Sequence, residues 1–309
     1  MKKKKKRRLI WAFVILLGLL FKFGCDYMFN YAFVRSEKDF INSKDSISVR
    51  KAQNWLKKTK KETWYENSAD GKLKLVANFV PAESFTNKTI VVFHGYTKNK
   101  EHMADYIHLF HKAGYNVLAP DARASGESEG KVIGYGWPER KDNLRWINQI
   151  IKRTGGSKSE IGLFGVSMGG ASVMYLAGES LPSEVKVLVE DCGYSSIRAE
   201  LTYQLYQMFK LPSFPLIQGV NIKTRVRGGY DFNEADATKQ LQKNKLPILF
   251  IHGSNDKFVP TKMIYDNYKA TSAPKKMLIV KGASHANSFE KEPQNYRNTV
   301  IGFIRKYMP

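Results

Sequence analysis

Residues 161–170, with the sequence Ile-Gly-Leu-Phe-Gly-Val-Ser-Met-Gly-Gly, decide the fold class of this 309-residue chain. An apolar run typical of a buried strand ends in Gly-x-Ser-x-Gly, and the small and apolar residues 171–178 follow as a helix would. This context predicts a nucleophile elbow, a sharp turn that holds the hydroxyl of Ser167 clear of the sheet. Gly165 and Gly169 would let backbone segments cross closely at that turn. The competing interpretation is a tight strand–helix connection with an incidental serine.

Two possible partners of Ser167 follow in chain order. Residues 246–251 predict a buried parallel strand, and Asp256 lies in the loop after it. Residues 276–280 predict the next strand, and His285 lies in the loop that follows. Serine becomes nucleophilic when a neutral imidazole accepts its proton, and a buried carboxylate holds that imidazole in the correct tautomer. We therefore expect a catalytic triad in the order Ser167, Asp256, His285.

Apolar runs and helical patterns alternate along the rest of the chain. The runs that predict parallel strands are residues 90–94, 116–119, 161–165, 185–190, 246–251 and 276–280. Helical patterns occupy residues 99–113, 138–153, 261–271 and 288–307. A turn signal at residues 69–71 predicts a hairpin before the first of these strands. The alternation predicts an α/β fold with a mostly parallel sheet and helices on both faces.

These motifs resemble those of the α/β-hydrolases over residues 64–309. The resemblance is to the bacterial cell-surface branch with a short cap, which is related to esterase-like and serine aminopeptidase proteins. Residues 90–97 resemble the His-Gly strand end of this family, and residues 121–128 resemble its Asp-x-Arg-Gly-x-Gly-x-Ser loop. Ala124 departs from that loop pattern, because glycine is usual at its position.

The resemblance implies an oxyanion hole made of two backbone donors. These donors would be the N–H groups of Tyr96, after the His-Gly strand end, and of Met168, after the nucleophile. Such groups face the negative oxygen of the tetrahedral intermediate, and each stabilises the transition state by about 3–4 kcal/mol.

The resemblance also bears on the choice of the acid. The sequence Gly-x-x-Asp-x-x-Val-Pro around Asp256 fits the usual acid loop of the family. Asp191 is the alternative, because it ends the strand predicted at residues 185–190 and some α/β-hydrolases carry their acid there. We favour Asp256. His94 and His252 lie next to glycine at strand ends and are expected to be structural.

The N-terminal segment has the pattern of a membrane anchor. Seven successive cations, residues 2–8, precede the apolar residues 9–21, and a full span of about 20 residues reaches Phe29. Lys22 can extend its amine toward the membrane surface and can pair with Asp26. No Ala-x-Ala cleavage site follows closely, so we favour an uncleaved signal anchor over a cleaved signal peptide. The basic end would stay in the cytoplasm, with the catalytic domain outside.

The formal net charge of +22 at pH 7 predicts an anionic membrane or cell-wall surface as neighbour. For the residues beyond the N-terminus, a solvated basic surface that aids solubility is the alternative. Nucleic acid is disfavoured, because no nucleic-acid-binding motif accompanies the charge. Cys25 lies in the membrane segment and Cys192 near a late strand, so a disulfide between them is not expected.

The chain divides into three predicted parts. Residues 1–30 form the basic tail and signal anchor, residues 31–63 a basic stalk or N-terminal helix, and residues 64–309 the hydrolase domain. Within the last part, the insertion at residues 194–245 predicts a short helical cap that walls an apolar group, although core packing of one helix explains the same pattern. Because every predicted strand and catalytic residue lies beyond residue 63, we expect the anchor to be dispensable for hydrolysis.

The predicted function is that of an outward-facing, membrane-anchored serine hydrolase. It would cleave a carboxylic ester of a small-molecule acyl substrate through an acyl-enzyme, without a metal or an organic cofactor. A serine peptidase acting on short peptides, an acyltransferase and a non-catalytic envelope-binding protein are the alternatives. The sequence does not indicate an oligomeric state.

Overall fold

In the computed structural model, which describes residues 2–36 and 46–309, the apolar runs of the sequence form one eight-stranded sheet. The strand order is β1-β2-β4-β3-β5-β6-β7-β8, and every neighbouring pair from β4 to β8 is parallel. β1 and β2 form the predicted hairpin, and β2 pairs antiparallel with β4. The strands are β1 Glu62–Asn67, β2 Lys74–Val80, β3 Lys88–Phe93, β4 Asn116–Pro120, β5 Glu160–Val166, β6 Val185–Asp191, β7 Ile248–Gly253 and β8 Lys275–Val280.

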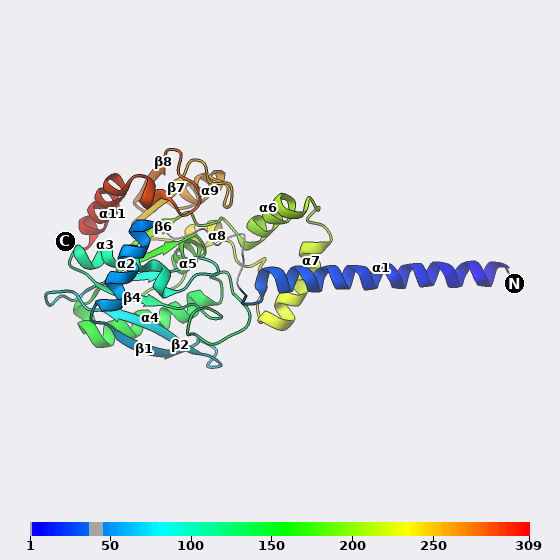
Figure 1. Ribbon diagram of the computed structural model, residues 1–309, viewed down its shortest axis with the longest axis horizontal. Coiled ribbons are helices and arrows are strands. Elements are labelled where there is room, and N and C mark those ends of the chain that lie inside the picture. Colours follow the sequence, from blue (N-terminus) through cyan, green and yellow to red (C-terminus); the bar gives the residue numbers. More distant parts are fainter. Residues whose placement is uncertain (1, 37–45) are drawn as a thin grey trace.

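Helices cover both faces of this sheet (Figure 1), as expected of the α/β class. Successive side chains of a strand point to opposite faces. Ile90 and Val92 of β3 therefore join the apolar cluster that contains α3 and α11, whereas Val91 and Phe93 join the cluster that contains α4 and α5. The helices are α1 Lys2–Phe33, α2 Ile47–Lys58, α3 Ala104–Lys112, α4 Glu139–Thr154, α5 Met168–Leu176, α6 Ile197–Phe209, α7 Leu216–Lys223, α8 Ala237–Leu241, α9 Lys262–Ala270, α10 Ser288–Lys291 and α11 Pro293–Tyr307.

Two predicted helices differ in detail from the observed ones. The pattern at residues 99–113 opens with a 3₁₀ turn, Lys100–Met103, before α3 begins. The pattern at residues 288–307 is divided into α10 and α11 at Glu292. Pro293 lacks an N–H and fits the first turn of a helix, and it keeps the residue before it out of the helical conformation.

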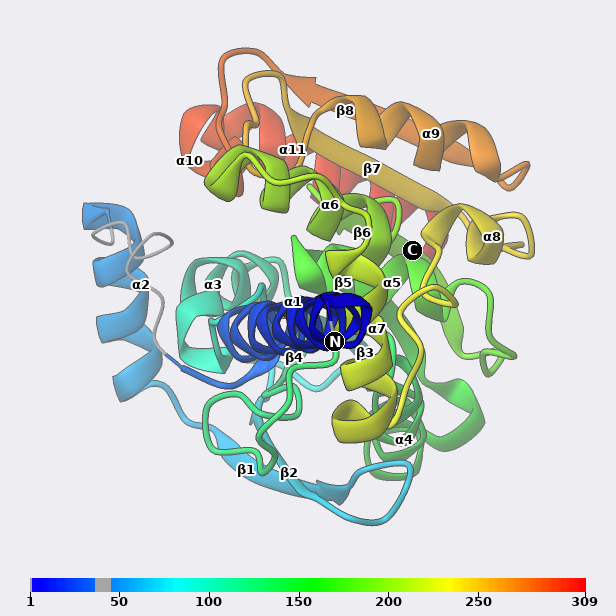
Figure 2. The same cartoon turned by 90° about the vertical axis from the view of Figure 1, so that its right-hand side faces the viewer.

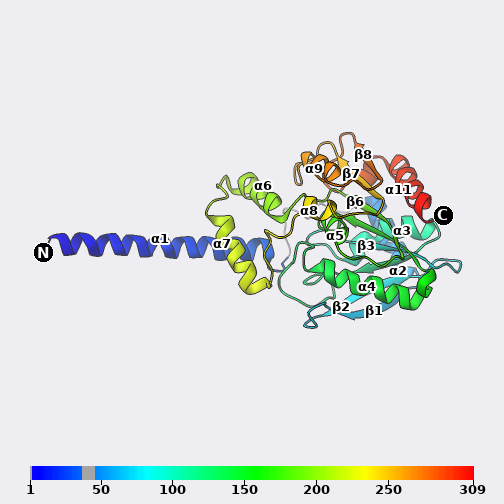
Figure 3. The same cartoon turned by 180° about the vertical axis from the view of Figure 1, so that it is seen from behind.

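Helix α1 has two parts with different surroundings. Its first part projects away from the fold, and its end packs into the fold (Figures 1 and 3). The helix is long and apolar enough to cross a membrane, and only 6% of the residues in its most apolar stretch are buried. Phe29 and Phe33, in contrast, are fully buried in the core cluster of the sheet. The end of α1 thus packs into the same core as the sheet, whereas the sequence predicts a separate anchor over residues 1–30.

The segment that follows α1 contains a second N-terminal helix. Part of the predicted stalk, residues 37–45, lies outside the described residues. Helix α2 begins at the cap residue Ser46, whose hydroxyl accepts the N–H of Val49 at 3.3 Å. Ala52 and Leu56 are buried on the face that packs against α3. This face fixes α2 on the domain surface.

Helices α6 and α7, with the π-helical turn Thr224–Gly228, form a cap beside α1 (Figures 1 and 2). Helix α7 packs closely on α1, because a Cβ at Gly219 would lie 2.3 Å from Cys25 Sγ. Helix α8 also falls in the predicted cap range but packs on α5 in the helical layer. The cap proper therefore consists of α6, α7 and the π-helical turn.

Candidate active site

Ser167 lies at a sharp turn between β5 and α5, at the carboxyl end of the strand. Its φ of 57° and ψ of −115° lie outside the regions that L-residues favour. The turn requires glycine on both sides: a Cβ at Gly165 would lie 2.2 Å from the carbonyl oxygen of Gly169, and a Cβ at Gly169 would lie 2.1 Å from that of Phe93. The N–H of Ser167 donates to the carbonyl of Asp191 at 2.7 Å, which holds the turn in place.

The structure brings the three predicted triad residues together. His285 Nε2 lies 2.9 Å from Ser167 Oγ, and His285 Nδ1 lies 2.7 Å from Asp256 Oδ2. Asp256 follows β7 and His285 follows β8, so both reach Ser167 from the carboxyl ends of parallel strands. When Nδ1 donates to the carboxylate, Nε2 of the neutral imidazole is left to accept the serine proton.

Asp256 is buried and held in one orientation. Its Oδ1 accepts the N–H groups of Phe258 and Val259, each at 2.9 Å. Its Oδ2 faces His285 and also Nε2 of His252, which lies 3.2 Å away. Burial alone would raise the pKa of Asp256, but the hydrogen bonds from His252 and His285 outweigh burial and lower the pKa to about 2. The group is therefore a carboxylate at neutral pH.

His252, which is expected from the sequence to be structural, lies beside Asp256. It is fully buried, and its Nε2 lies 3.0 Å from the carbonyl oxygen of Val259 as well as near Asp256. Burial would lower the pKa of His252, but the hydrogen bond with Asp256 and its negative charge more than offset this, so the pKa is raised. The spacing of four residues between His252 and Asp256 is a usable signal, because a tight loop returns the acid to the strand end.

Asp191, the alternative acid, has a different partner. Its Oδ2 accepts the hydroxyl of Tyr296 at 2.7 Å. Burial raises the pKa of Asp191 to about 6, and the bond with Tyr296 only partly opposes this shift. His285 is thus hydrogen-bonded to Asp256, whereas Asp191 is hydrogen-bonded to Tyr296 of α11.

The loop after β3 holds Tyr96 beside the nucleophile, since a Cβ on Gly95 would lie 3.5 Å from Ser167 Cβ. His94 Nε2 accepts the N–H of Ala122 at 2.9 Å, so its Nδ1 carries the proton and donates to the carbonyl of Gly95 at 2.8 Å. The carbonyl of Gly95 and the N–H of Tyr96 belong to one planar trans peptide and point in opposite directions. The N–H of Tyr96 therefore points away from His94.

The second predicted oxyanion donor, Met168, is the first residue of α5. The first N–H groups of a helix have no partner within the helix, and the helix dipole places partial positive charge there. Among the hydrogen bonds of the described residues, none uses the N–H of Tyr96. Both predicted donors are therefore available to a ligand.

Cys192, Asp256 and His285 form a cluster whose possible ligand atoms lie within 4.8 Å of one another. Asp256 and His285 already bind each other, as the triad requires. Burial, followed by the charge of Asp191, raises the pKa of the Cys192 thiol. The hydrogen bond between Asp256 and His285 explains why these two side chains lie close together.

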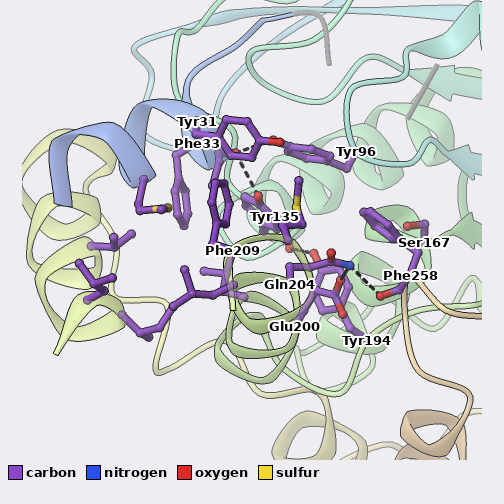
Figure 4. A pocket seen from close by; sticks show the side chains of 18 residues that line it. Tyr31, Phe33, Tyr96, Tyr135, Ser167, Tyr194, Glu200, Gln204, Phe209 and Phe258 are labelled. Carbon is purple, nitrogen blue, oxygen red and sulfur yellow. Dashed lines mark hydrogen bonds between the residues drawn. The ribbon is translucent and has the colours of Figure 1, made fainter. Parts of the chain in front are cut away.

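Two hollows meet at Ser167. The first is an apolar pocket between α1, α6 and α7 (Figure 4), and of its lining residues only Ser167, Glu200 and Gln204 are neither apolar nor aromatic. The second is a more polar groove that includes His285. Tyr96 and Phe258 line both hollows. An apolar group and a polar group of one substrate can thus lie on either side of Ser167.

Comparisons with known proteins agree with this architecture. The family model described as "Serine aminopeptidase, S33" matches residues 85–212. Protein YqkD of Bacillus subtilis is 33% identical over 219 residues, which are 71% of this chain and 72% of that protein. Protein YfhR of Escherichia coli K12 is 23% identical over 219 residues, or 70% and 69% of the two chains.

Solved structures share the fold. The Pyrococcus furiosus esterase Pf2001 superposes with a TM-score of 0.68 at 21% identity, covering 90% of this chain and 99% of that one. An α/β serine hydrolase homologue from Coxiella burnetii superposes with a TM-score of 0.54 at 17% identity, covering 78% and 96%. The sheet order, the nucleophile turn and these relatives together show that the chain belongs to the α/β-hydrolase superfamily.

Proposed function

We propose that this protein is a serine hydrolase that cleaves a carboxylic ester through an acyl-enzyme. The observation that carries the proposal is the hydrogen-bonded chain from Ser167 through His285 to Asp256 at the nucleophile turn. The unfavourable φ of Ser167 is a second support, because strained backbone of this kind clusters at active sites and ligand-binding positions.

The proposed reaction uses groups that the chain itself supplies. His285 accepts the proton of Ser167 while Oγ attacks the ester carbonyl carbon, and the N–H groups of Tyr96 and Met168 stabilise the oxyanion. The ester C–O bond then breaks, and the leaving alcohol takes the proton from His285. In the second half, His285 deprotonates a water molecule that attacks the acyl-enzyme, which releases the acid and restores Ser167.

The pocket favours an ester with an apolar acyl group over a peptide. An aminopeptidase needs a negative charge to bind the ammonium group of its substrate. Glu200 is the one acidic side chain that lines the apolar pocket within the described residues. Burial raises the pKa of Glu200 to about 8, so this carboxyl is uncharged at neutral pH. The pocket therefore offers no charge to such an ammonium group.

A fluorophosphonate probe and paired substrates test the proposal. We expect covalent labelling at Ser167 and turnover of p-nitrophenyl esters. Aminoacyl p-nitroanilides should be hydrolysed at least about a hundredfold more slowly, which corresponds to about 2.7 kcal/mol in activation free energy. Mass spectrometry of the labelled peptide locates the site. A preference for the anilides would favour the peptidase, and an unlabelled protein without turnover would favour the binding scaffold.

We also propose that α1 is an uncleaved signal anchor that places the catalytic domain on the outer face of the membrane. Support comes from the seven cations before the apolar stretch and from the exposure of that stretch in the fold. Because Phe29 and Phe33 are core residues, removal of the last turns of α1 by a signal peptidase would remove part of the core.

The full-length protein is expected to stay in the membrane fraction after washing with salt and alkaline carbonate. Attraction to anionic lipid is screened within about 10 Å at 0.1 M salt, whereas a spanning helix is not released. Protease added to intact protoplasts should degrade the catalytic domain. A variant with Leu16→Arg and Leu17→Arg is the control, because each arginine at mid-span costs about 2.5–3.5 kcal/mol of insertion free energy. Full-length protein in the soluble fraction, or shielded from protease, would contradict the anchor.

A further inference from the structure

The end of α1 forms one wall of the apolar pocket that leads to Ser167. Met28, Tyr31 and Phe33 line the pocket opposite α6 and α7, with the nucleophile at its inner end (Figure 4). Pockets that bind apolar ligands have this composition, with few polar groups among many apolar and aromatic ones. The helix that carries the membrane-spanning stretch is therefore also part of the binding site.

Hydrogen bonds fix this wall to the proposed oxyanion loop. The carbonyl oxygen of Ala32 accepts the hydroxyl of Tyr96 at 2.6 Å and that of Tyr135 at 3.0 Å. Burial raises the pKa of Tyr96 to about 12, so its hydroxyl keeps the proton that it donates. The N–H of Ile133 donates to the carbonyl of Phe33 at 2.8 Å. The pocket wall thus cannot move independently of the residue that is proposed to hold the oxyanion.

The length of α1 places the mouth of this pocket at the membrane surface. A span needs about 20 helical residues, which from Leu9 extends to Met28. Helix α7 already covers part of that span, because a Cβ at Gly219 would lie 2.9 Å from the ring of Phe21 and one at Gly24 would lie 3.5 Å from Leu216. If residues 9–28 cross the bilayer, the part of α7 that contacts Phe21 and Gly24 lies within its outer half, and Met28, which lines the pocket, lies at its outer surface.

The cap surface fits contact with lipid. Among the described residues outside α1, ten large apolar side chains are exposed, and six of these lie in the cap or in the connection between α6 and α7. Such clustering marks an interaction surface, whereas single exposed apolar residues need no explanation. Phe214 and Val226 are the most exposed of the six, at 71% and 80%. Because α7 lies beside α1 (Figure 2), a bilayer crossed by α1 would lie close to the cap.

Cations lie at the same level of α1. Lys22 is 71% exposed and pairs with Asp26, which also binds Lys223 of the cap. Arg227 donates to Asn30 at 2.9 Å. Lys22 lies within the span but can extend its amine to the membrane surface, where lysine and arginine meet the anionic head groups of phospholipids. Apolar side chains and cations thus surround the end of α1 in the arrangement that a lipid–water boundary requires.

We propose that the substrate is an acyl ester of a membrane lipid, and that its acyl chain reaches Ser167 from the outer leaflet through the pocket walled by the end of α1. This inference rests on the proposed ester hydrolysis. The acyl chain lies between α1, α6 and α7, the ester carbonyl lies at Ser167, and the alcohol lies in the polar groove. The alcohol leaves with the proton from His285, and water then releases the fatty acid.

Variants of the pocket wall test this assignment in the full-length protein. For wild type we expect kcat/KM to rise at least about tenfold from a butanoyl to a dodecanoyl ester. Burial of only about two of the additional methylene groups in the pocket is enough for this factor. Met28→Trp or Leu205→Trp, which fills the pocket from α1 or α6, should reduce this ratio about tenfold. Phe23→Trp and Tyr206→Trp, on exposed faces of the same helices, should keep it. Unchanged ratios in both pocket variants would overturn the assignment.

A binding measurement separates the pocket from the chemistry. Full-length protein with Ser167→Ala should bind the fluorescent fatty acid cis-parinaric acid, and the added Met28→Trp should weaken this binding at least about tenfold. Binding by wild-type protein without turnover of any ester would leave the pocket standing and refute the hydrolase proposal. Turnover of short esters without such binding would refute the pocket and leave the hydrolase.

The source of the lipid is tested in vesicles of phosphatidylcholine and phosphatidylglycerol that contain the full-length protein. A fluorogenic diacyl lipid ester in the same bilayer should be hydrolysed at least about tenfold faster than the same lipid in separate vesicles, because the pocket mouth faces the bilayer in which α1 is inserted. Equal rates in the two arrangements would show that substrate arrives through water, which would overturn entry from the membrane.

Discussion

Replacement of Ser167 by alanine is expected to lower kcat for ester hydrolysis by on the order of 10⁶ and to abolish fluorophosphonate labelling. The change removes only Oγ, and with it the atom that forms the acyl-enzyme. The backbone bond from residue 167 to Asp191 and the glycine contacts of the turn do not depend on that atom. Steady-state hydrolysis of a p-nitrophenyl ester, with circular dichroism to confirm the fold, measures the effect.

Ser172→Ala is the matched control for this variant. Ser172 is also buried on α5, one turn after the nucleophile, and its hydroxyl donates to the carbonyl of Met168 at 2.9 Å rather than to an imidazole. Its removal should leave turnover within a few-fold of wild type, because one neutral hydrogen bond contributes only about 1 kcal/mol to stability. Residual activity of Ser167→Ala within about tenfold of wild type would exclude Ser167 as the nucleophile.

Asp256→Asn is expected to lower kcat by about 10⁴ while the protein stays folded. The amide can donate to Nδ1 of His285, which favours the tautomer whose Nε2 carries a proton and cannot accept one from Ser167. It also removes the charge that stabilises the imidazolium. The N–H groups of Phe258 and Val259 still find an acceptor in the amide oxygen, so the loop keeps its shape. Steady-state ester hydrolysis near neutral pH measures the change.

Asp191→Asn serves as the comparison. It is the same substitution at another buried aspartate, whose backbone carbonyl accepts the N–H of Ser167. The asparagine oxygen can still accept the hydroxyl of Tyr296. Since Asp191 does not bind His285, turnover should change by less than about tenfold, well below the loss for a triad acid. A reversal of the two effects would move the acid to β6 and would contradict the observed pairing of His285.

The sequence predicted the triad contacts because they depend on local rules. Each parallel strand places its following loop at the same edge of the sheet, so residues after β5, β7 and β8 must meet there. Gly165 and Gly169 predicted the turn at Ser167, since a Cβ at either position would collide with backbone atoms. These signals need only a strand, a turn and the order of the chain.

Features that depend on packing between distant segments escaped prediction. The apolar residues at the end of α1 suit a membrane span equally well, so nothing in their pattern indicates that Phe29 and Phe33 enter the core or that Ala32 contacts Tyr96. The cap contact between Gly219 and Cys25 joins positions 194 residues apart in sequence. Periodicity reports one face of a helix and does not identify the partner of that face.

Ala124 shows how a departure from a family pattern can leave the backbone unchanged. It has a φ of 59°, the left-handed conformation for which the usual glycine is suited. An L-residue pays roughly 1–2 kcal/mol in this region. The neighbouring Gly126 has no such freedom, because a Cβ there would lie 2.1 Å from Asp121 Oδ2. The loop thus tolerates alanine at one of its two positive-φ positions.

The bonds from Tyr96 and Tyr135 to the carbonyl of Ala32 join the end of α1 to the loop beside Ser167. On the proposed orientation, this enzyme meets its substrate by lateral diffusion within one leaflet, in two dimensions. Its velocity then follows the mole fraction of the ester among neighbouring lipids, whatever the volume of the surrounding medium. Inert lipid added to the leaflet dilutes the substrate and slows the reaction, whereas added buffer does not.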